Sequence, residues 1–426
     1  MRILIVNTSE NTGGAAVAAN RLKEALNNNG VKAKMLVIHK STDDITVVPL
    51  KHKWLTRWHF LTERLGIFLH LHLHYSKDKL FGIDTGSSGT DITRLPEFRE
   101  ADLIHLSWIN QGMLSLADIR RILRSGKPVV WTMHDLWPAS SICHYARNCH
   151  RYESRCGNCP LLPGGGSRND LSAKVWRRKR QALGTNSILF VTCSRWLADK
   201  AKKSGLLSGQ KLMSIPNPID THVFCREDQE KARIYAGLPA DKRLILFVSQ
   251  RVTDQRKGMD YFITAMNKMV EQHPEMRQNT GIAILGGQAE ELAGKLPLPS
   301  YPLGYVSDEK KIASVYNSVD MFVLPSLEDN LPNTIMEAMA CGVPCVGFNT
   351  GGIPEMIDHL KNGYVAEYKS VDDLAKGMHW VMCEADREAL AAEALRKVNT
   401  CYSQYSVAMK YIEAYNEALA LKRYKL

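Results

Sequence analysis

The sequence predicts an α/β protein made of two doubly wound, Rossmann-like domains that face a central cleft. Two observations lead to this fold class: short apolar strands alternate with amphipathic helical segments, and the alternation starts again after a Pro-rich segment at residues 215–220. Alternating strands and helices favour a parallel sheet covered on both faces. A length of 426 residues with 45% hydrophobic residues is enough for two domains with substantial cores.

The first half opens with a strand–helix–strand unit. An apolar strand at residues 2–6 leads through a Gly-containing turn into an alanine-rich helix that ends near residue 28. The same alternation predicts strands near residues 33–38, 103–106, 128–133 and 188–193, with helices at residues 117–124 and 171–183. We therefore assign residues 1–214 to an N-terminal domain.

The strand pattern restarts in the second half. Apolar strands are predicted at residues 244–249, 282–286, 321–324 and 344–348, again separated by helical segments such as residues 259–270. This second series of strands places a C-terminal domain at residues 215–400.

The last segment, residues 401–426, predicts a separate helix. Apolar side chains recur every third residue, at Met409, Ile412, Tyr415, Ala418 and Leu421. An amphipathic helix needs a partner for its apolar stripe, so we expect this helix to pack back on the N-terminal domain.

Charge and hydropathy narrow the range of functions. The 55 basic and 44 acidic residues give a net charge of +11, which favours nucleic acid, a phosphorylated metabolite or an anionic lipid as partner. No apolar run reaches the roughly 18 residues of a membrane-spanning helix. The apolar start from Ile3 to Val6 is too short for a signal peptide, so we expect a cytoplasmic protein.

Two glycines follow the first strand. Gly13 and Gly14 stand between this strand and the first helix, where a bare backbone and the N–H groups of the helix start can bind an anion. A tight turn without a ligand explains the same glycines. The spacing also lacks the full G-x-G-x-x-G pattern of nicotinamide-binding proteins.

Charged residues follow two strands of the second half. Arg251 and Lys257 come after the first of these strands, and Asp329 and Glu337 come after a later one. Because ligands bind at the carboxyl ends of parallel strands, both pairs can reach one ligand. Arg and Lys suit a diphosphate, and a carboxylate can accept hydrogen bonds from a ribose or sugar diol. Solvated surface charges and helix capping, with Asn333 as the N-cap, are the structural alternatives.

These motifs together resemble the retaining glycosyltransferases of family 4, which have the two-domain GT-B fold. The resemblance rests on Arg251-x5-Lys257 and on Asp329-x7-Glu337 within the segment PSLEDNLPNTIMEAMACG. The family has Glu where this chain has Asp329, so the carboxylate reaches one methylene less far. Further matches, spread over nearly the whole chain, are Gly13-Gly14, the junction Ile215–Pro218, His134 at the end of a strand, and the segment Thr350–Glu355.

The resemblance implies a role for each matching residue. Glu337 would bind the nucleotide ribose, and Arg251 and Lys257 would bind the diphosphate. Asp329 and the backbone after it would bind the donor sugar, with His134 at the reacting face. The implied catalytic residues are His134, Asp329, Arg251 and Lys257, and the implied donor-binding residues are Gly13, Gly14, Asn217, Asn330, Leu331, Glu337, Gly351 and Gly352.

The resemblance also implies a different binding function for each domain. Residues 215–400 would bind the nucleotide sugar, and residues 1–214 would bind the acceptor. It implies no cofactor for catalysis, because fixed cations and helix N-termini can stabilise the departing diphosphate.

Four of the ten cysteines crowd into a loop at residues 143–160. They are Cys143, Cys149, Cys156 and Cys159, and four thiolates can form a tetrahedral zinc site in which a C-x2-C turn presents two sulfurs. The spacing is not that of a standard zinc finger. Two disulfides are disfavoured in the cytoplasm, and four core thiols are unusual in so polar a loop. The loop is therefore a candidate structural zinc site, without an implied catalytic role.

Two segments of the first half combine basic and aromatic residues. Residues 51–69 contain two tryptophans and Arg64, and residues 174–180 contain five basic residues and Trp176. Such surfaces can rest on anionic lipid, which would suit an acceptor carried by a membrane lipid and a location at the inner face of the membrane. A buried helix face with solvated charges is the alternative.

The residues and the resemblance predict glycosyl transfer. We expect a hexosyltransferase-type enzyme that moves a sugar with retention from a nucleoside-diphosphate sugar to a glycan or lipid-linked acceptor in surface polysaccharide biosynthesis, without a nucleic-acid partner. A nucleotide-sugar epimerase would need the same donor site but no acceptor surface. A zinc-containing nucleic-acid-binding protein would explain the net charge and the cysteines, but the basic residues are spread over both domains and no recognised nucleic-acid module occurs.

Overall fold

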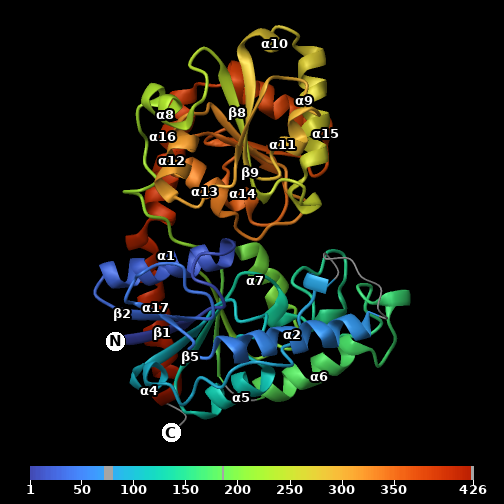
Figure 1. Ribbon diagram of the computed structural model, residues 1–426, viewed down its shortest axis with the longest axis vertical. Coiled ribbons are helices and arrows are strands. Elements are labelled where there is room, and N and C mark those ends of the chain that lie inside the picture. The colour runs from blue at the N-terminus through green and yellow to red at the C-terminus, as the bar shows by residue number, and fades with distance from the viewer. Residues whose placement is uncertain (72–79, 185–186, 424–426) are drawn as a thin grey trace. The chain divides into compact units, whose positions relative to one another are not determined.

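The computed structural model describes residues 1–71, 80–184 and 187–423, and the chain forms two compact units (Figure 1). Unit 1 contains Met1–Pro216 and Val407–Leu426, and unit 2 contains Asn217–Ser406. The chain therefore enters unit 2 two residues later than the sequence suggested, and it returns to unit 1 within the last helix instead of at residue 401.

Unit 1 is built on a seven-stranded parallel sheet with the order β3-β2-β1-β4-β5-β6-β7. The strands are β1 (Arg2–Val6), β2 (Lys32–Val37), β3 (Val47–Pro49), β4 (Leu103–Leu106), β5 (Val129–Met133), β6 (Leu189–Thr192) and β7 (Lys211–Ser214). Strand β1 pairs with both β2 and β4, so the strand order reverses between β1 and β4. This reversal is the switch point at which doubly wound sheets bind ligands.

Helices cover the sheet of unit 1. They are α1 (Gly14–Asn28), α2 (Lys53–His70), α4 (Pro96–Glu100), α5 (Leu116–Arg124), α6 (Leu171–Leu183), α7 (Arg195–Lys202) and α17 (Gln404–Arg423). Local signals start several of them: Ser115 accepts a hydrogen bond from the Asp118 amide at the start of α5, and the Asp118 side chain accepts one in return from the Ser115 amide.

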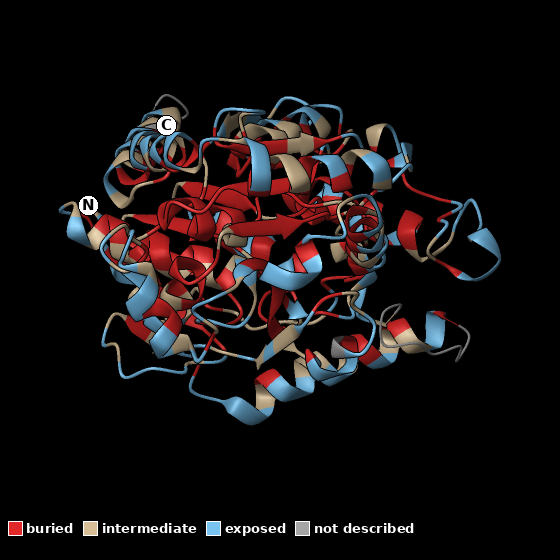
Figure 2. Cartoon of the chain, turned by 90° about the horizontal axis from the view of Figure 1, so that it is seen from above, coloured by how far each residue is buried: buried red, intermediate tan, exposed pale blue. Residues whose placement is uncertain are grey.

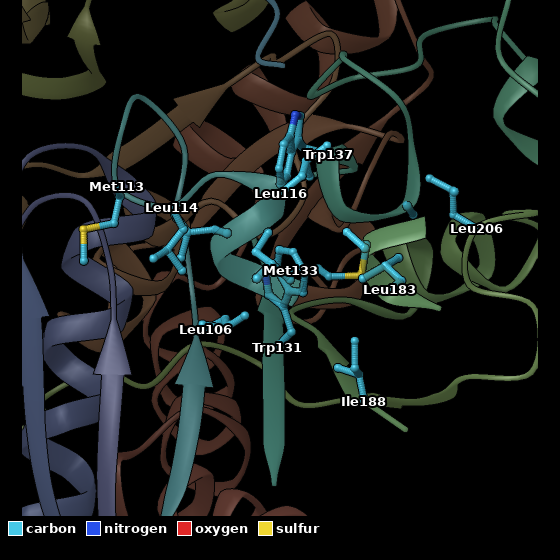
Figure 3. Packing of buried hydrophobic residues seen from close by; sticks show 14 of the residues in the cluster. Leu106, Met113, Leu114, Leu116, Trp131, Met133, Trp137, Leu183, Ile188 and Leu206 are labelled. Carbon is cyan, nitrogen blue, oxygen red and sulfur yellow. The ribbon is translucent and has the colours of Figure 1, made fainter. Parts of the chain in front are cut away.

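Large apolar side chains hold β5 in the centre of unit 1 (Figure 3). Trp131 of β5 is 2% exposed and stacks on Phe190 of β6 with ring centroids 5.7 Å apart. Met133, the last residue of β5, is fully buried in the same cluster. This packing fixes the carboxyl end of β5, where His134 follows.

Helix α17 packs on the sheet of unit 1. Tyr411 and Tyr415 are buried, and their hydroxyls lie 2.9 Å from Thr132 Oγ1 and 2.7 Å from His105 Nδ1, respectively. The apolar stripe expected from the sequence is partly wrong, because Met409 is 38% exposed. Steps of three residues fall about 60° short of a full helical turn, so a stripe spaced only by three winds around the helix. The buried face is formed by Val407, Ala408, Tyr411, Ala414, Tyr415 and Ala418.

Unit 2 contains a second parallel sheet, with the order β10-β9-β8-β11-β12-β13. Its strands are β8 (Arg243–Arg251), β9 (Thr280–Gly287), β10 (Ser300–Gly304), β11 (Met321–Leu324), β12 (Cys345–Phe348) and β13 (Gly363–Ala366). The order reverses between β8 and β11, which defines the switch point of unit 2. Two parallel, doubly wound sheets confirm the predicted fold class.

The helices of unit 2 are α8 (Gln229–Ala236), α9 (Met259–Gln272), α10 (Met276–Asn279), α11 (Glu290–Ala293), α12 (Glu309–Asn317), α13 (Asn333–Ala340), α14 (Ile353–Met356), α15 (Val371–His379) and α16 (Arg387–Cys401). Central strands are buried and outer helix faces are exposed (Figure 2). Within the described parts of the chain, no helix combines the length and apolar character needed to cross a membrane.

Candidate functional site

Three loops at the switch point of unit 2 follow neighbouring strands. Strand β8 ends at Arg251 and leads through a short 3₁₀ turn, Gln255–Lys257, into α9, while β11 ends at Leu324 and β12 at Phe348. Because β8, β11 and β12 are adjacent and parallel, these loops share one edge of the sheet. Most of the donor-site residues predicted from the sequence lie on them.

A buried ion-pair cluster centres on Asp329. Its Oδ2 lies 2.5 Å from Lys257 Nζ and 3.5 Å from Arg256 Nη1, and it accepts a hydrogen bond from Ser326 Oγ at 3.2 Å. The side chains of Lys257 and Asp329 are only 17% and 11% exposed. Burial by itself would raise the pKa of Asp329, but the charges of Lys257 and Arg256 hold this pKa below its ordinary value. Burial also lowers the pKa of Lys257, and Asp329 opposes that change.

Two glycines allow these loops to approach closely. A Cβ on Gly258 would lie 1.9 Å from the Pro325 carbonyl oxygen, and a Cβ on Gly351 would lie 1.7 Å from the Asp329 carbonyl oxygen. Both glycines have positive φ, 74° and 62°. The Gly352 amide donates to the Asp329 carbonyl at 3.1 Å, so the loop after β12 holds the backbone of Asp329 directly.

Glu337 lies on α13 and is 8% exposed. Its Oε2 accepts a hydrogen bond from the Tyr316 hydroxyl at 3.1 Å. Burial and the neighbouring Glu337 charge raise the pKa of Tyr316 well above its ordinary value, so the phenol stays a donor. The expectation that Asn333 caps α13 is wrong: Pro332 occupies the N-cap, and Asn333 Oδ1 accepts a hydrogen bond from Asn217 Nδ2 at 3.0 Å.

The predicted donor residues do not all join the cluster around Asp329. Asn330 and Leu331 are buried directly after Asp329. Arg251 is exposed at the end of β8, and its side chain makes no hydrogen bond or ion pair with any residue that the structure describes. Arg256 takes its place beside Asp329 and also donates to the Glu328 carbonyl at 3.0 Å. Arg256 was not identified from the sequence, although its position next to Lys257 could have indicated it.

In unit 1, His134 follows β5. Its Nε2 lies 3.0 Å from Ser107 Oγ, and its Nδ1 lies 3.5 Å from Cys193 Sγ. Burial lowers the pKa of His134 to about 4, with only partial opposition from Asp135. The imidazole is therefore neutral near pH 7 and can act as a hydrogen-bonding group.

A second histidine, His144, was considered from the sequence only as a spare zinc ligand, together with His150. His144 Nδ1 lies 2.7 Å from Asp135, and its Nε2 lies 2.7 Å from Asp84. Burial opposes protonation, but the two carboxylates outweigh it and raise the pKa of His144 to about 10. Trp108 Nε1 donates to Asp135 at 3.0 Å. His144 is therefore a buried cation that ties the loop after β5 to Asp84.

Gly13 is the N-cap of α1. It has a φ of 90°, and no side chain caps the helix. A Cβ added at Gly13 would meet no atom within 4 Å beyond its chain neighbours. Gly14 is the first residue of α1. Position 13 therefore requires glycine because of its positive φ, and not because a neighbouring atom would meet a Cβ there.

The four clustered cysteines lie in the loop between β5 and α6. Cys156 and Cys159 are buried, Cys143 and Cys149 are half-buried, and all four are free thiols. Burial, with smaller effects from neighbouring thiols, raises the pKa of Cys156 to about 12 and of Cys159 to about 11.

Ligand atoms of His273, Glu275 and His379 lie within 4.8 Å of one another. This group sits at the far end of α9 from Lys257, about 20 Å along the helix. Within residues 1–71, 80–184 and 187–423, no other group of three or more His, Cys, Asp or Glu residues has its ligand atoms this close together. The sulfurs of the four clustered cysteines are therefore more widely spaced.

Helix α2 differs from the expected basic, aromatic surface. Five of its large apolar residues are exposed, but Ile67 is buried, and Arg64 is 5% exposed and paired with Asp84. In the second expected segment, Trp176 and Lys179 are each 2% exposed. That segment therefore presents no aromatic surface, and the expectation for residues 174–180 was wrong.

The chain matches two family models. Residues 12–223 match the model described as Glycosyltransferase Family 4, and residues 242–384 match the model described as Glycosyl transferases group 1. An uncharacterised glycosyltransferase of Methanocaldococcus jannaschii is 31% identical over 46% of this chain and 50% of the relative. A D-inositol 3-phosphate glycosyltransferase of Thermobispora bispora is 26% identical over 49% and 51%, respectively. The chain thus spans about half the length of these curated relatives.

Solved structures resemble the chain along nearly all its length. A sucrose-phosphate synthase from Thermosynechococcus elongatus covers 99% of both chains with a TM-score of 0.65 and 17% identity. An Anabaena protein in complex with UDP covers 98% of this chain and all of its own, with a TM-score of 0.63 and 15% identity. At these identities the likeness concerns the fold.

Proposed function

Since the chain belongs to the family 4 glycosyltransferases and has their GT-B fold, we propose that it moves a hexose with retention from a nucleoside-diphosphate sugar to a glycan or lipid-linked acceptor in surface polysaccharide assembly. The observation that carries this proposal is the cluster of Lys257, Arg256 and Asp329 at the switch point of unit 2. In this proposal unit 2 binds the donor and unit 1 binds the acceptor.

The two cations suit a departing diphosphate. When the bond between the anomeric carbon and the diphosphate oxygen breaks, the electron pair stays on that oxygen and negative charge develops there. Lys257 and Arg256, with Arg251 nearby in the sequence, would stabilise this charge without reorganising. A new bond to the acceptor hydroxyl oxygen then forms at the anomeric carbon, and the hydroxyl proton leaves with the diphosphate.

Asp329 acts in this proposal mainly as a positioning residue. Its Oδ2 is held by Lys257 and Ser326, so its carboxylate orients the ammonium group that meets the diphosphate. The buried backbone at Asn330 and Leu331 would then contact the sugar. An aspartate suits this role because the carboxylate already reaches Lys257 at 2.5 Å.

Glu337 would accept hydrogen bonds from the ribose hydroxyls. Tyr316 donates to one carboxylate oxygen at 3.1 Å, which orients the group as an acceptor pair for a vicinal diol. Neutral His134 would contact the transferred sugar through a hydrogen bond. Because the Anabaena neighbour was solved in complex with UDP and with UDP-glucose, UDP is the first nucleotide to test.

The donor proposal is tested by thermal unfolding with UDP, GDP, ADP and CMP, because a ligand that binds only the folded state raises its stability. An oligonucleotide serves as the control ligand. We expect one nucleoside diphosphate to raise the unfolding temperature, and a rise with the oligonucleotide alone would contradict the proposal.

Helix α2 supports an acceptor at a membrane surface. Its apolar residues are exposed at the spacing of one helix face, and they are Trp54, Trp58, Leu61, Leu65 and Leu69. The inward side instead carries Glu63 and Arg64, and Arg64 is paired with both Glu63 and Asp84. Exposed apolar stripes of this kind mark interaction surfaces.

The charge around α2 favours an anionic lipid surface as the partner. Lys51, Lys53 and Arg57 are exposed beside the two tryptophans, and α2 lies on the outer side of unit 1 (Figures 1 and 2). Aromatic and basic residues together bind the interface of anionic membranes. We therefore propose that α2 rests on lipid at the inner face of the membrane.

Vesicle co-sedimentation tests this membrane contact. The Trp54→Ser, Trp58→Ser double variant should bind anionic vesicles at least about tenfold more weakly than the wild type, because two interfacial anchors are lost. The matched control is Tyr235→Ser, which removes an exposed aromatic residue of unit 2. Equal binding by the double variant and the wild type would refute the role of α2.

A further inference from the structure

Two helices of unit 2, α9 and α15, pack against each other along the chain's second sheet (Figure 1). Met269 and Val270 of α9 and Met378 of α15 belong to one buried core cluster. An ion pair between Lys268 and Asp372 also joins the two helices. The core packing therefore fixes the backbone at the carboxyl ends of both helices.

Each of these two helix ends carries a histidine. His273 is the C-cap of α9, and His379 is the last residue of α15. Their imidazole rings stack with centroids 3.6 Å apart and an angle of 13° between the ring planes. The two side chains are 33% and 18% exposed, so an ion from solvent can reach the pair.

A carboxylate lies beside the two imidazoles. Glu275 follows His273 by two residues, and its Oε1 is 3.5 Å from His273 Nδ1. Pro274 between them has a fixed φ, and the Met276 amide donates to the His273 carbonyl at 3.1 Å. This short turn therefore holds the backbone that carries both side chains.

The spacing of the three side chains fits one small cation. His273, Glu275 and His379 each offer a ligand atom within 4.8 Å of the other two. In a tetrahedral zinc site with bonds of about 2.1 Å, neighbouring ligand atoms are about 3.4 Å apart, so no pair would have to close by more than about 1.4 Å. The stacked rings would also splay, because the lone pairs of parallel rings do not converge on one ion.

A second carboxylate orients one of the imidazoles. Glu384 ends the π-helical turn Trp380–Glu384 that follows α15, and its Oε1 lies 3.0 Å from His379 Nδ1. When His379 Nδ1–H donates to this carboxylate, the lone pair of Nε2 is left for a metal. Carboxylates in this outer position are common partners of metal-binding histidines.

The donor atoms select the class of cation. Imidazole nitrogens suit Zn²⁺ and its neighbours among the transition metals, whereas Mg²⁺ and Ca²⁺ prefer oxygen ligands. Two histidines and one glutamate form a zinc donor set that leaves the fourth position to water. The carboxyl end of α9 also carries partial negative charge, which favours a cation.

We propose that unit 2 binds one Zn²⁺ ion through His273, Glu275 and His379, with a water molecule as the fourth ligand. The ion would connect the end of α9 to the end of α15 and stabilise unit 2. The site lies about 20 Å along α9 from Lys257, so the ion takes no part in the glycosyl transfer proposed above.

Calorimetric titration of Zn²⁺ into the full-length chain, first stripped of metal and kept reduced, tests the proposal. We expect a saturable site that His273→Gln, His379→Gln and Glu275→Gln each weaken at least about tenfold, because each change removes one ligand. The matched control is His222→Gln, which removes an exposed histidine of unit 2 outside the group. This control should bind zinc as the wild type does.

A second control separates this site from the clustered cysteines of unit 1. The Cys156→Ser, Cys159→Ser double variant should keep the site, and loss of the site in this variant would overturn the proposal.

The proposal stays testable if a histidine variant does not fold. Glu275→Gln then decides, because the Glu275 side chain is 69% exposed and surface substitutions have little effect on folding. Zinc should raise the unfolding temperature of the wild type more than that of Glu275→Gln. A wild type without saturable zinc binding, or equal zinc affinity in the wild type and Glu275→Gln, would overturn the proposal.

Discussion

Units 1 and 2 place polar residues at the same point of the same topology, but with different charge. In unit 2 the loops at the switch point bring Lys257 and Arg256 to a single carboxylate, Asp329. In unit 1 the corresponding loops carry neutral His134, and His144 is already neutralised between two carboxylates. Lysine and arginine suit a diphosphate, whereas a neutral imidazole suits a hydroxyl group. Topology therefore selects the place of each site, and loop residues select its chemistry.

We expect the largest effect on the difference between the two units from a substitution of Lys257. Lys257→Ala should lower kcat/KM by about 10²–10³, because it removes a preorganised cation from the developing diphosphate charge. It also leaves Asp329 with one cation fewer in a buried site. Steady-state kinetics with the donor varied would measure the loss.

The control for Lys257 is Lys268→Ala, which removes a half-exposed lysine of α9 paired with Asp372. This change should leave kcat/KM within about twofold, as expected for a surface pair. A fully active Lys257→Ala enzyme would contradict the assignment of Lys257 to the diphosphate.

Alanine substitutions at two glycines, one in each unit, allow a direct comparison of stability costs. Gly351→Ala should destabilise the protein by about 3 kcal/mol, since positive φ is strained and the new Cβ would meet the Asp329 carbonyl. Gly13→Ala has strained φ but nothing within 4 Å, so it should cost about 1 kcal/mol. Urea unfolding would give both values, and equal costs would show that the close approach to Asp329 is unimportant.

The charge of His144 predicts a pH dependence in unit 1. Its folded pKa of about 10 lies above the ordinary value, so the stability it contributes is fully present below pH 6.5 and is lost as the pH rises towards 10. The stability difference between the wild type and His144→Gln should shrink between pH 6 and pH 9.5 by on the order of 2 kcal/mol. Using this difference cancels Lys179, which titrates in the opposite sense because burial lowers its pKa to about 7. A constant difference across this range would contradict the buried-cation assignment.

The smallest effect concerns the C-terminal helix. Tyr415→Phe should destabilise unit 1 by about 1–2 kcal/mol, because it leaves buried His105 Nδ1 without the hydroxyl 2.7 Å away. Tyr405→Phe, at a residue 67% exposed, should change the stability by less than about 0.5 kcal/mol. Thermal unfolding compares them, and matching values would show that the buried hydroxyl of α17 does not stabilise unit 1.

Much of the fold was predictable because the central strands are buried on both faces. Strands β4 and β11 are fully buried. β11 is a continuous apolar run and β4 is interrupted only by His105, and the bounds of both were predicted without error. Edge strands carry no such signal: β7 is largely exposed, and β10 contains Pro302 and a register shift. Neither edge strand was predicted from the sequence.

The charged residues in the loops at the switch point of unit 2 could be found from the sequence because they belong to short motifs. Lys257 and Asp329 were each identified from short motifs, but the contact between them depends on the pairing of β8 with β11. The network of Asp84, Asp135 and His144 joins residues up to sixty positions apart, and no local spacing marks it. The inward-facing charges of α2 were missed for the same reason, because Arg64 finds its partner on a later segment.

The measurement that tests the central claim most directly is donor binding to the wild type and to Glu337→Ala. Binding is detected as a rise in the unfolding temperature with each nucleoside diphosphate. We predict that one of them, with UDP tried first, raises the unfolding temperature of the wild type and that Glu337→Ala loses this rise while remaining folded. An unchanged rise in Glu337→Ala, or none with any nucleoside diphosphate in the wild type, would contradict the donor site in unit 2.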